Sequence, residues 1–293
     1  MSAEALAGYA LTPARKRRDR VARGAVLACT IIALIPLGLI IYYLLQKGLS
    51  SWSPSFFTTD PTGNTFFKNS SIGGIQSAII GTIEIVALAS LISVPIGIGV
   101  AVWLVEYGRN SWFANTVRFF VDVLTGVPSI IFGLFIYIAL IIGTGSSYAG
   151  YKGSLALSLL MLPIVIRSAE VILLLVPSAL RESALALGAP RWRVIFNVVL
   201  PTALPGMVTG VLLAIARAAG ETAPLLFTAG ATFKTNTNLG AFTNSLPVQI
   251  YNDVISPTTA VVNRAWGAAL TLVAMILVLN LVARLISRRS RLG

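Results

Sequence analysis

Six stretches of mostly apolar residues, each long enough to cross a membrane, run along this chain of 293 residues. A transmembrane helix needs about 20 such residues to span the hydrocarbon core of a bilayer. Apolar residues make up 56% of the chain and charged residues only 11%, which is too few charges to cover a water-exposed surface. We therefore predict an all-α integral membrane protein with six transmembrane helices. The predicted spans are residues 24–46, 74–105, 117–142, 154–176, 204–229 and 264–286.

The residue types that are rare or absent exclude several classes of enzyme. The chain has no histidine and one cysteine, Cys29, which excludes a Ser-His-Asp triad, the common zinc sites and an internal disulfide. It also lacks the G-x-x-x-x-G-K-[ST] loop that binds nucleotide phosphates. The net charge of +12 comes from Lys and Arg that flank the apolar stretches, not from a polar domain. We predict that the chain is not an enzyme, holds no metal or cofactor, and contacts membrane lipid rather than nucleic acid.

The positions of Lys and Arg predict how the spans are oriented. Loops that face the cytoplasm carry an excess of these residues. The two termini and the loops after the second and fourth spans carry 15 of them, and the other loops carry five. Both termini are therefore predicted to be cytoplasmic, as six spans require. The predicted regions are a basic cytoplasmic tail at 1–23, an external loop at 47–72 and a cytoplasmic C-terminus at 289–293.

Two pairs of ionisable residues lie inside predicted spans. Arg167 and Glu170 are three residues apart, and Arg217 and Glu221 are four apart, so each pair shares a helical face. Charges at membrane depth are costly and commonly mark a functional site. In one interpretation, each pair is structural and holds helices together. In the other, the two arginines line a path for an anion, because the planar fork of a guanidinium group suits tetrahedral oxyanions. The two glutamates would then control how available each guanidinium group is to the anion.

Asp122 lies in the third predicted span, shortly before Pro128. It is interpreted either as an acid that caps a helix or reaches the interface, or as a helix-packing or gating residue together with Pro128. Glu84, in the second span, is expected to pair with a neighbouring helix. The second span is also long, and is expected to tilt or to bend at Pro95, where the helix lacks a backbone donor.

The cytoplasmic segment at 177–201 is unlike an ordinary loop. Residues 178–187 favour a short helix, and Gly188 allows a left-handed stop. Pro190 can begin a second short helix that ends near residue 201. This segment either rests on lipid headgroups, as its arginines and Trp192 favour, or docks against a partner protein.

The same segment resembles the EAA signature of ABC importer permeases, whose pattern is E-A-A-x3-G-x9-I-x-L-P. Here the matching residues are Glu182-Ser183-Ala184, then Gly188, then Val198-Val199-Leu200-Pro201, with Ser183 and Val198 as mild departures. The resemblance implies a type I ABC importer permease, or MetI-like, architecture over residues 73–288. It also implies that the segment is a coupling helix, in which Glu182, Ala184 and Gly188 contact a separate ATPase chain.

A second set of stretches is similar to the phosphate ABC permeases, and most similar to the PstA family. These stretches are 104–107, 126–130, 162–167 and 214–225, the last reading Ala-Ile-Ala-Arg-Ala-Ala-Gly-Glu-Thr-Ala-Pro-Leu. The resemblance implies a bacterial cell-membrane importer with a PstC-like permease subunit, two PstB-like ATPase subunits and an external phosphate-binding protein. It further implies that Arg167 and Arg217 serve the path of inorganic phosphate, near Glu221.

Several alternatives stay open at this point. The chain could be the paired PstC-like subunit, or a type I permease for another oxyanion such as sulfate, molybdate or phosphonate. An ion-driven secondary transporter would leave the EAA-like spacing unexplained. A membrane scaffold that transports nothing would leave both buried arginines unexplained.

Overall fold

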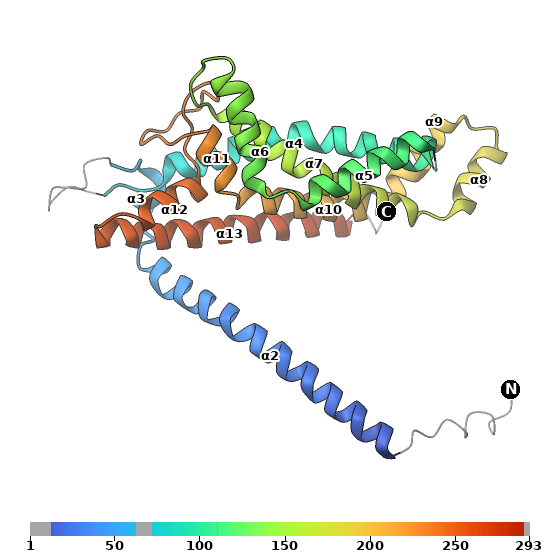
Figure 1. Ribbon diagram of the computed structural model, residues 1–293, viewed down its shortest axis with the longest axis horizontal. Helices are drawn as coiled ribbons and strands as arrows, with labels where there is room; N and C mark the ends of the chain where they lie inside the picture. The colour runs from blue at the N-terminus through green and yellow to red at the C-terminus, as the bar shows by residue number, and fades with distance from the viewer. Residues whose placement is uncertain (1–12, 63–71, 110, 290–293) are drawn as a thin grey trace.

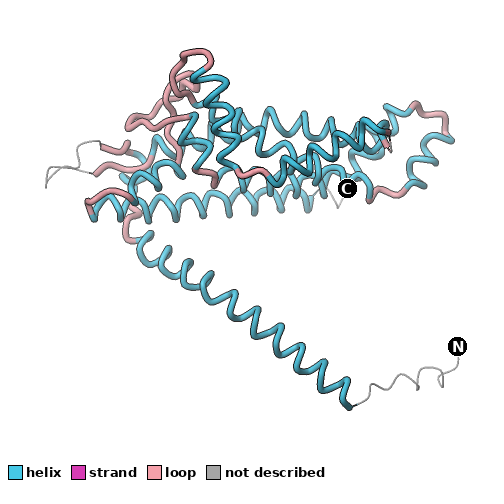
Figure 2. Tube along the Cα trace, viewed as in Figure 1, coloured by secondary structure: helices cyan, strands magenta, loops and turns pink. Residues whose placement is uncertain are grey.

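The computed structural model describes residues 13–62, 72–109 and 111–289, and it is helical almost throughout (Figures 1 and 2). Within these residues, the one β-type contact is an isolated bridge between Pro61 and Gly73. The all-α prediction is confirmed. Parts of three predicted regions lie outside the described residues, namely 1–12 of the N-terminal tail, 63–71 of the external loop and 290–293 of the C-terminus.

The helices follow the predicted apolar stretches in order. The first part of the chain forms α2 (Pro13–Leu49), α3 (Pro54–Thr58), α4 (Gln76–Val102), the π-helical turn η1 (Trp103–Gly108), α5 (Trp112–Gly126), α6 (Ser129–Ile136) and the π-helical turn η2 (Tyr137–Ile142). The second part forms α7 (Gly150–Leu174), α8 (Ser178–Ala186), α9 (Arg191–Val194), the π-helical turn η3 (Ile195–Val199), α10 (Leu200–Ala219), α11 (Ala223–Thr228), α12 (Leu246–Val254) and α13 (Thr259–Arg289). In the described residues, five helical segments are long and apolar enough to cross a membrane, or six when one bent pair counts as a span.

Helix α7 forms the centre of the bundle. It packs against α4, α5, α6, α10 and α11. Its Leu157, Met161 and Val165 share a buried core with Ile85 of α4 and Ala214 of α10. In the most apolar stretch of α7, 56% of the residues are buried, which makes α7 the most enclosed of the candidate spans in the described residues. Side chains of α7 therefore meet neighbouring helices on several sides.

Two glycines set how α10 lies against α7. A Cβ atom on Gly206 would lie 2.7 Å from Ile172, and one on Gly210 would lie 2.3 Å from the Cβ of Ser168. Small residues four apart let membrane helices approach closely. The two contacts also define an antiparallel register, in which Gly210 lies opposite Ser168 and Gly206 lies opposite Ile172.

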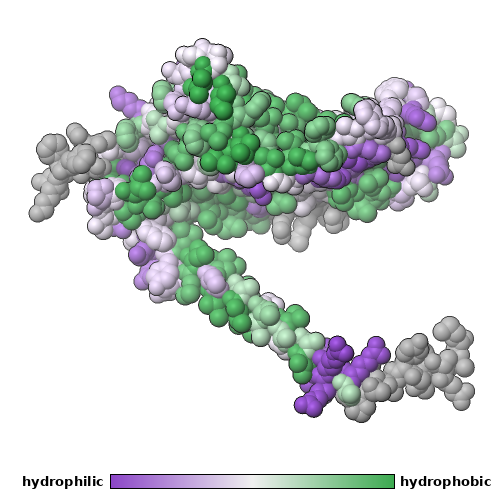
Figure 3. Space-filling view, viewed as in Figure 1, coloured by the Kyte–Doolittle hydropathy of each residue, from purple (hydrophilic) through white to green (hydrophobic). Residues whose placement is uncertain are grey.

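Helix α2 stands apart from the bundle. Figure 1 shows that it meets the other helices only near its C-terminal end and then diverges from them. There a Cβ atom on Gly48 would lie 2.8 Å from Leu270 of α13. No residue in the most apolar stretch of α2 is buried. Figure 3 shows apolar surface along α2 and along the side of the bundle, with hydrophilic residues concentrated toward the ends, as a bilayer favours.

The third predicted span is not one straight helix, which corrects the expectation for 117–142. Helices α5 and α6 with η2 meet at 101° across Val127 and Pro128. Val127 is extended (ψ 131°), because the ring of a following proline disfavours a helical conformation. Pro128 cannot donate a backbone hydrogen bond and stands at the N-cap of α6.

The boundaries of the fifth predicted span are also corrected. The helix runs from Arg191 to Ala219, so no break separates the second short cytoplasmic helix from the span near residue 201. The π-helical turn η3 ends at Val199 and leads directly into α10. Pro201, which has no backbone N–H, lies in the first turn of α10. The span then stops at Gly220, and Pro224 begins the separate helix α11. Pro95, by contrast, lies inside α4 without interrupting it.

Candidate functional site

Arg167 of α7 uses its whole guanidinium group to bind two carboxylates. Its Nε donates to Asp122 Oδ1 at 2.9 Å, and its Nη2 donates to both Asp122 oxygens at 2.5 Å. Its Nη1 donates to Glu170 Oε2 at 2.8 Å, as the spacing of three residues predicts. Asp122 belongs to α5, so this contact joins two helices. Asp122 is therefore an ion-pair partner between α5 and α7 and not a helix cap.

Arg118 is a fourth member of this group, and sequence reasoning assigned it to a cytoplasmic loop. Its Nε donates to Glu170 Oε1 at 2.6 Å. It also donates to the carbonyl oxygens of Arg109 and Leu104. Charges thus alternate along Arg118, Glu170, Arg167 and Asp122, which we call the four-charge chain. Arg118 and Glu170 are 52 residues apart, so no local sequence pattern indicates their contact.

Exposure changes along the four-charge chain. The side chain of Glu170 is 4% exposed, whereas those of Arg167 and Asp122 are 38% and 55% exposed. The Arg118 end is held in protein, and the Asp122 end opens onto the surface of this subunit. Buried ion pairs are costly to form and costly to break, whereas exposed ones contribute little. The two ends of the chain therefore have different roles.

Arg217 and Glu221 form a looser pair at the end of α10. The closest approach, from Arg217 Nε to Glu221 Oε1, is 3.9 Å, and the Arg217 side chain is 60% exposed. In the antiparallel register of α10 and α7, Val211 lies opposite Arg167, and Arg217 is six residues further along α10. At 1.5 Å per residue, the two arginines are about 9 Å apart along the bundle. Arg217 lies on the side away from α8.

The predicted coupling segment begins with α8, as expected. Gly188 has a φ of +80°, the left-handed conformation that ends the helix. Glu182 is exposed, and Ala184 packs partly against the core that contains Leu173 and Val199. Leu187 is 89% exposed, so the tip of this segment presents apolar surface.

Arg181 ties α8 to the end of the second span. Its Nε donates to Glu106 of η1 at 3.0 Å, and its two other nitrogens donate to the carbonyl oxygens of Val176 and Leu173. Arg181 and Glu106 line, together with Glu182, a pocket of about 130 Å³. Sequence reasoning counted Arg181 only as a topology signal.

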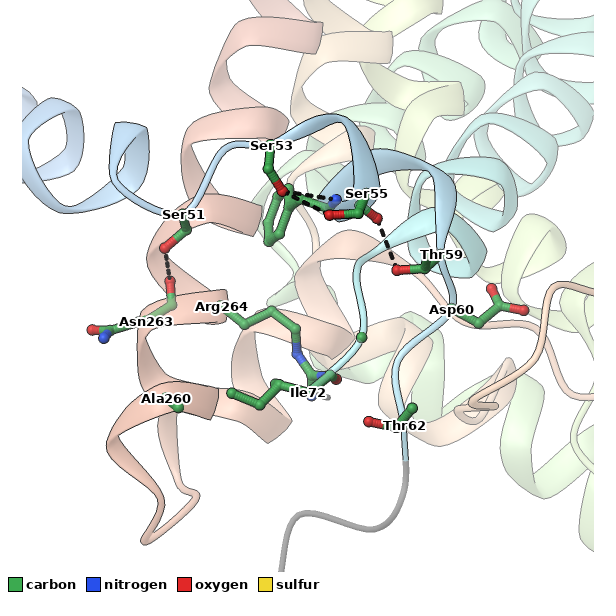
Figure 4. Close-up of a pocket in the computed structure, with 12 residues that line it drawn as sticks. Ser51, Ser53, Ser55, Thr59, Asp60, Thr62, Ile72, Ala260, Asn263 and Arg264 are labelled. Carbon is green, nitrogen blue, oxygen red and sulfur yellow. Dashed lines mark hydrogen bonds between the residues drawn. The ribbon is translucent and has the colours of Figure 1, made fainter. Parts of the chain in front are cut away.

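A second polar cluster lies at the opposite end of the bundle. Arg264 of α13 binds both carboxylate oxygens of Asp253 in α12, at 2.7 and 2.8 Å, and donates to the carbonyl of Ile72. Both side chains are about 5% exposed or less. Arg264 lines a pocket of about 420 Å³ together with Ser51, Ser53 and Ser55, among others. Figure 4 shows Arg264 among these lining side chains. Since Asp253 and the Ile72 carbonyl take the donors of Arg264, this cluster holds helices together.

Glu84 does not form the pair that the sequence suggested. Within the described residues, its Oε2 is buried and accepts no hydrogen bond. The same residues contain no group of three His, Cys, Asp or Glu side chains that could hold a metal ion.

Comparison with known proteins places this geometry in a family. The model of the binding-protein-dependent transport system inner membrane component matches residues 93–292. The phosphate transport system permease protein PstA of Yersinia pestis is 39% identical over 94% of this chain and 92% of its own length. PstA of Haemophilus influenzae is 41% identical over 92% of this chain and 94% of its own. The chain belongs to the PstA permease family.

Solved structures agree with this assignment at the level of the fold. The MetNI methionine ABC transporter in an inward-facing conformation matches with a TM-score of 0.61 and 21% identity, over 74% of this chain and 97% of the matched chain. A bacterial ABC transporter for the acidic polysaccharide alginate also gives 0.61, with 18% identity over 93% and 96%. The expected type I ABC importer permease architecture is confirmed. This PstA-family permease therefore has the helical bundle of a type I importer permease.

Proposed function

We propose that the chain is a membrane permease subunit of an ATP-driven importer of inorganic phosphate, and that it forms half of the translocation pathway. The observation that carries this proposal is the identity of about 40% to phosphate transport system permeases over nearly the whole chain. Arg217, within an apolar span, supports it, because its side chain is exposed and its contact with Glu221 is 3.9 Å long, so its guanidinium group has no close counter-charge at membrane depth.

The proposed path passes the two arginines in turn. Arg217 lies nearer the external end, so phosphate meets it first and then moves about 9 Å along the bundle to Arg167. Both side chains are exposed on this subunit, where a second permease chain would complete the conduit. Glu221, close to Arg217, would accept a hydrogen bond from the P–OH group of HPO₄²⁻, a group that sulfate lacks.

The proposed complex has three kinds of protein partner. A PstC-like permease would cover the arginine face, and two PstB-like ATPase subunits would hydrolyse ATP on the cytoplasmic side. Glu182, Ala184 and Gly188 on the coupling segment would carry the ATPase contact, and the exposed Leu187 supports a docked partner there. An external phosphate-binding protein would dock on the loops at 47–72 and 230–263. Both termini would lie in the cytoplasm of a bacterial cell.

The proposed mechanism is alternating access. Closure of the ATPase dimer would push on α8, and the bond from Arg181 to Glu106 would pass that movement to the end of the second span. The bundle would then open outward, and hydrolysis would return it to an inward-open state. Such a switch requires nucleotide to bind one state more tightly than the other.

Phosphate uptake by the complete complex in proteoliposomes tests this function. Arg167→Lys and Arg217→Lys keep the charge but remove the fork, so each is expected to lower uptake about tenfold or more, because about 1.4 kcal/mol corresponds to a factor of ten. Arg23→Lys, on the exposed part of α2, is the matched control and should transport normally. Wild-type uptake that sulfate abolishes as effectively as unlabelled phosphate would contradict phosphate as the substrate.

A further inference from the structure

Asp122 occupies the side of Arg167 that a tetrahedral oxyanion would use. The Nε and Nη2 atoms of a guanidinium group form the parallel donors that suit carboxylate and phosphate oxygens. Asp122 takes both of these donors, at 2.5 to 2.9 Å. In this conformation a phosphate ion can bind Arg167 by its fork only after Asp122 has left.

The other acid on Arg167 is placed differently. Glu170 binds the remaining nitrogen, is 4% exposed and is also neutralised by Arg118. It belongs to the same helix as Arg167, so its distance from Arg167 is set within α7. Asp122 is 55% exposed and comes from α5. Movement of the part of α5 beyond Arg118 therefore changes the Asp122 contact and spares the contact between Arg167 and Glu170.

The position of Asp122 along α5 fits such a movement. It lies five residues before Val127, where α5 ends and the chain turns by 101° into α6. Arg118 anchors the first part of α5 to Glu170 and to the carbonyl oxygens of Leu104 and Arg109, whereas Val121 is the one buried residue of α5 beyond it. Beyond the turn, α6 packs tightly on α11, where a Cβ atom on Gly133 would lie 2.6 Å from Pro224. The last part of α5, which holds one buried residue and ends at an extended residue, can shift while its neighbours stay in place.

We propose that Asp122 is an internal counter-ion that gates Arg167. With the path closed, its carboxylate neutralises Arg167 and excludes anions. When α5 moves during the transport cycle, Asp122 withdraws and phosphate takes its place on the same two donors. The inference rests on the proposed function and adds to it a residue that keeps the path closed between turnovers. The partial exposure of the pair suits this role, because an exposed ion pair is readily exchanged and a buried one is not.

Phosphate leakage in the absence of ATP tests the gate. The complete complex, with the Asp122→Asn substitution, is reconstituted in vesicles loaded with labelled phosphate. Asparagine keeps the shape and removes the charge, so leakage is expected to rise about fivefold or more, the lower end of typical coupling between sites. Asp122→Glu restores the carboxylate and should keep leakage near the wild-type level. Thr116→Ala is the matched control, because Thr116 lies on α5 and donates to a carbonyl of its own helix.

The outcomes distinguish failure of the gating proposal from failure of the proposed function. If the Asp122→Asn complex leaks no more phosphate than the wild type, and the wild-type complex imports phosphate, the gating proposal is overturned and the proposed function stands. A wild-type complex that imports no phosphate overturns both. A second measurement covers the case in which Asp122→Asn does not assemble. In the wild-type complex, amide exchange in residues 119–126 should rise when vanadate traps the transporter with phosphate, and unchanged exchange overturns the gate.

Discussion

The Nε atom of Arg181 in α8 lies 3.0 Å from Oε1 of Glu106 in η1, and this contact joins the predicted coupling segment to the end of the second span. Their side chains are 19% and 13% exposed, so the contact is largely shielded from water. Arg181 also binds two carbonyl oxygens at the end of α7. One side chain therefore connects the proposed coupling helix with two spans of the bundle.

Removing this connection should separate ATP hydrolysis from transport. Arg181→Gln leaves Glu106 and two carbonyl groups without their donor, which costs about 1–3 kcal/mol for a partly buried polar group. We expect phosphate imported per ATP hydrolysed to fall severalfold while ATPase activity persists. The ratio is measured in proteoliposomes, and Arg191→Gln, on the exposed start of α9, is the control. A proportional fall of both activities would mean that Arg181 only stabilises the fold.

The close packing of α10 on α7 should make Gly210 sensitive to a single methyl group. Gly210→Ala places a Cβ atom 2.3 Å from that of Ser168, so the helices must separate. We expect a loss of about 1–3 kcal/mol, as in other overpacked cores, seen as a lower midpoint of thermal unfolding in detergent. Gly99→Ala in α4 has open space around its Cβ and should not lower the midpoint. Equal midpoints for the two variants would contradict the register.

Two ion pairs outside the four-charge chain, Arg264–Asp253 and Arg217–Glu221, should respond differently to loss of one partner. Arg264 and Asp253 are almost fully buried and joined by two bonds. Asp253→Asn should therefore destabilise the protein by about 3–5 kcal/mol, because a buried guanidinium loses its counter-charge. Glu221→Gln should change stability by about 1 kcal/mol or less, since the 3.9 Å pair is exposed. Both are measured by thermal unfolding, and a larger effect at Glu221 would assign that pair a structural role.

Glu221→Gln should nevertheless alter selectivity for the anion. The proposed role of Glu221 is to accept a hydrogen bond from the P–OH group of phosphate. A glutamine amide can turn its NH₂ donor toward the anion instead, so it no longer favours the protonated ion over sulfate. We expect uptake to fall severalfold and inhibition by sulfate to become stronger relative to the wild type. Competition by sulfate is measured on labelled phosphate uptake. Unchanged uptake and unchanged competition would remove Glu221 from the path.

Much of the fold was predictable because a bilayer imposes strong local constraints. A span must be apolar for about 20 residues, so hydropathy located every segment that became a long helix. The i,i+3 spacing of Arg167 and Glu170 predicted their contact, and Gly188 was recognised as a helix stop. The break in the third span was missed, because the Gly126 to Ser129 stretch is short and the residues on both sides are apolar.

Contacts between distant residues could not be predicted in the same way. Arg118 meets Glu170 across 52 residues and Arg167 meets Asp122 across 45, and nothing in the local pattern distinguishes these partners from others. Arg118 and Arg181 were counted as charges of cytoplasmic loops, although both are bound to acids of other helices. Arg264 was counted among the external charges, although it is buried against Asp253.

The amino-acid sequence alone thus determined the helical membrane fold, the short helix that ends at Gly188 and the presence of two arginines in apolar spans, because these depend on hydropathy, local spacing and short motifs. Only the tertiary structure decided which acid each arginine binds, how far apart Arg167 and Arg217 lie and where α5 turns. Those features depend on the packing register of helices that are remote in the chain, and that register is set by steric fit, such as the contact of Gly210 with Ser168.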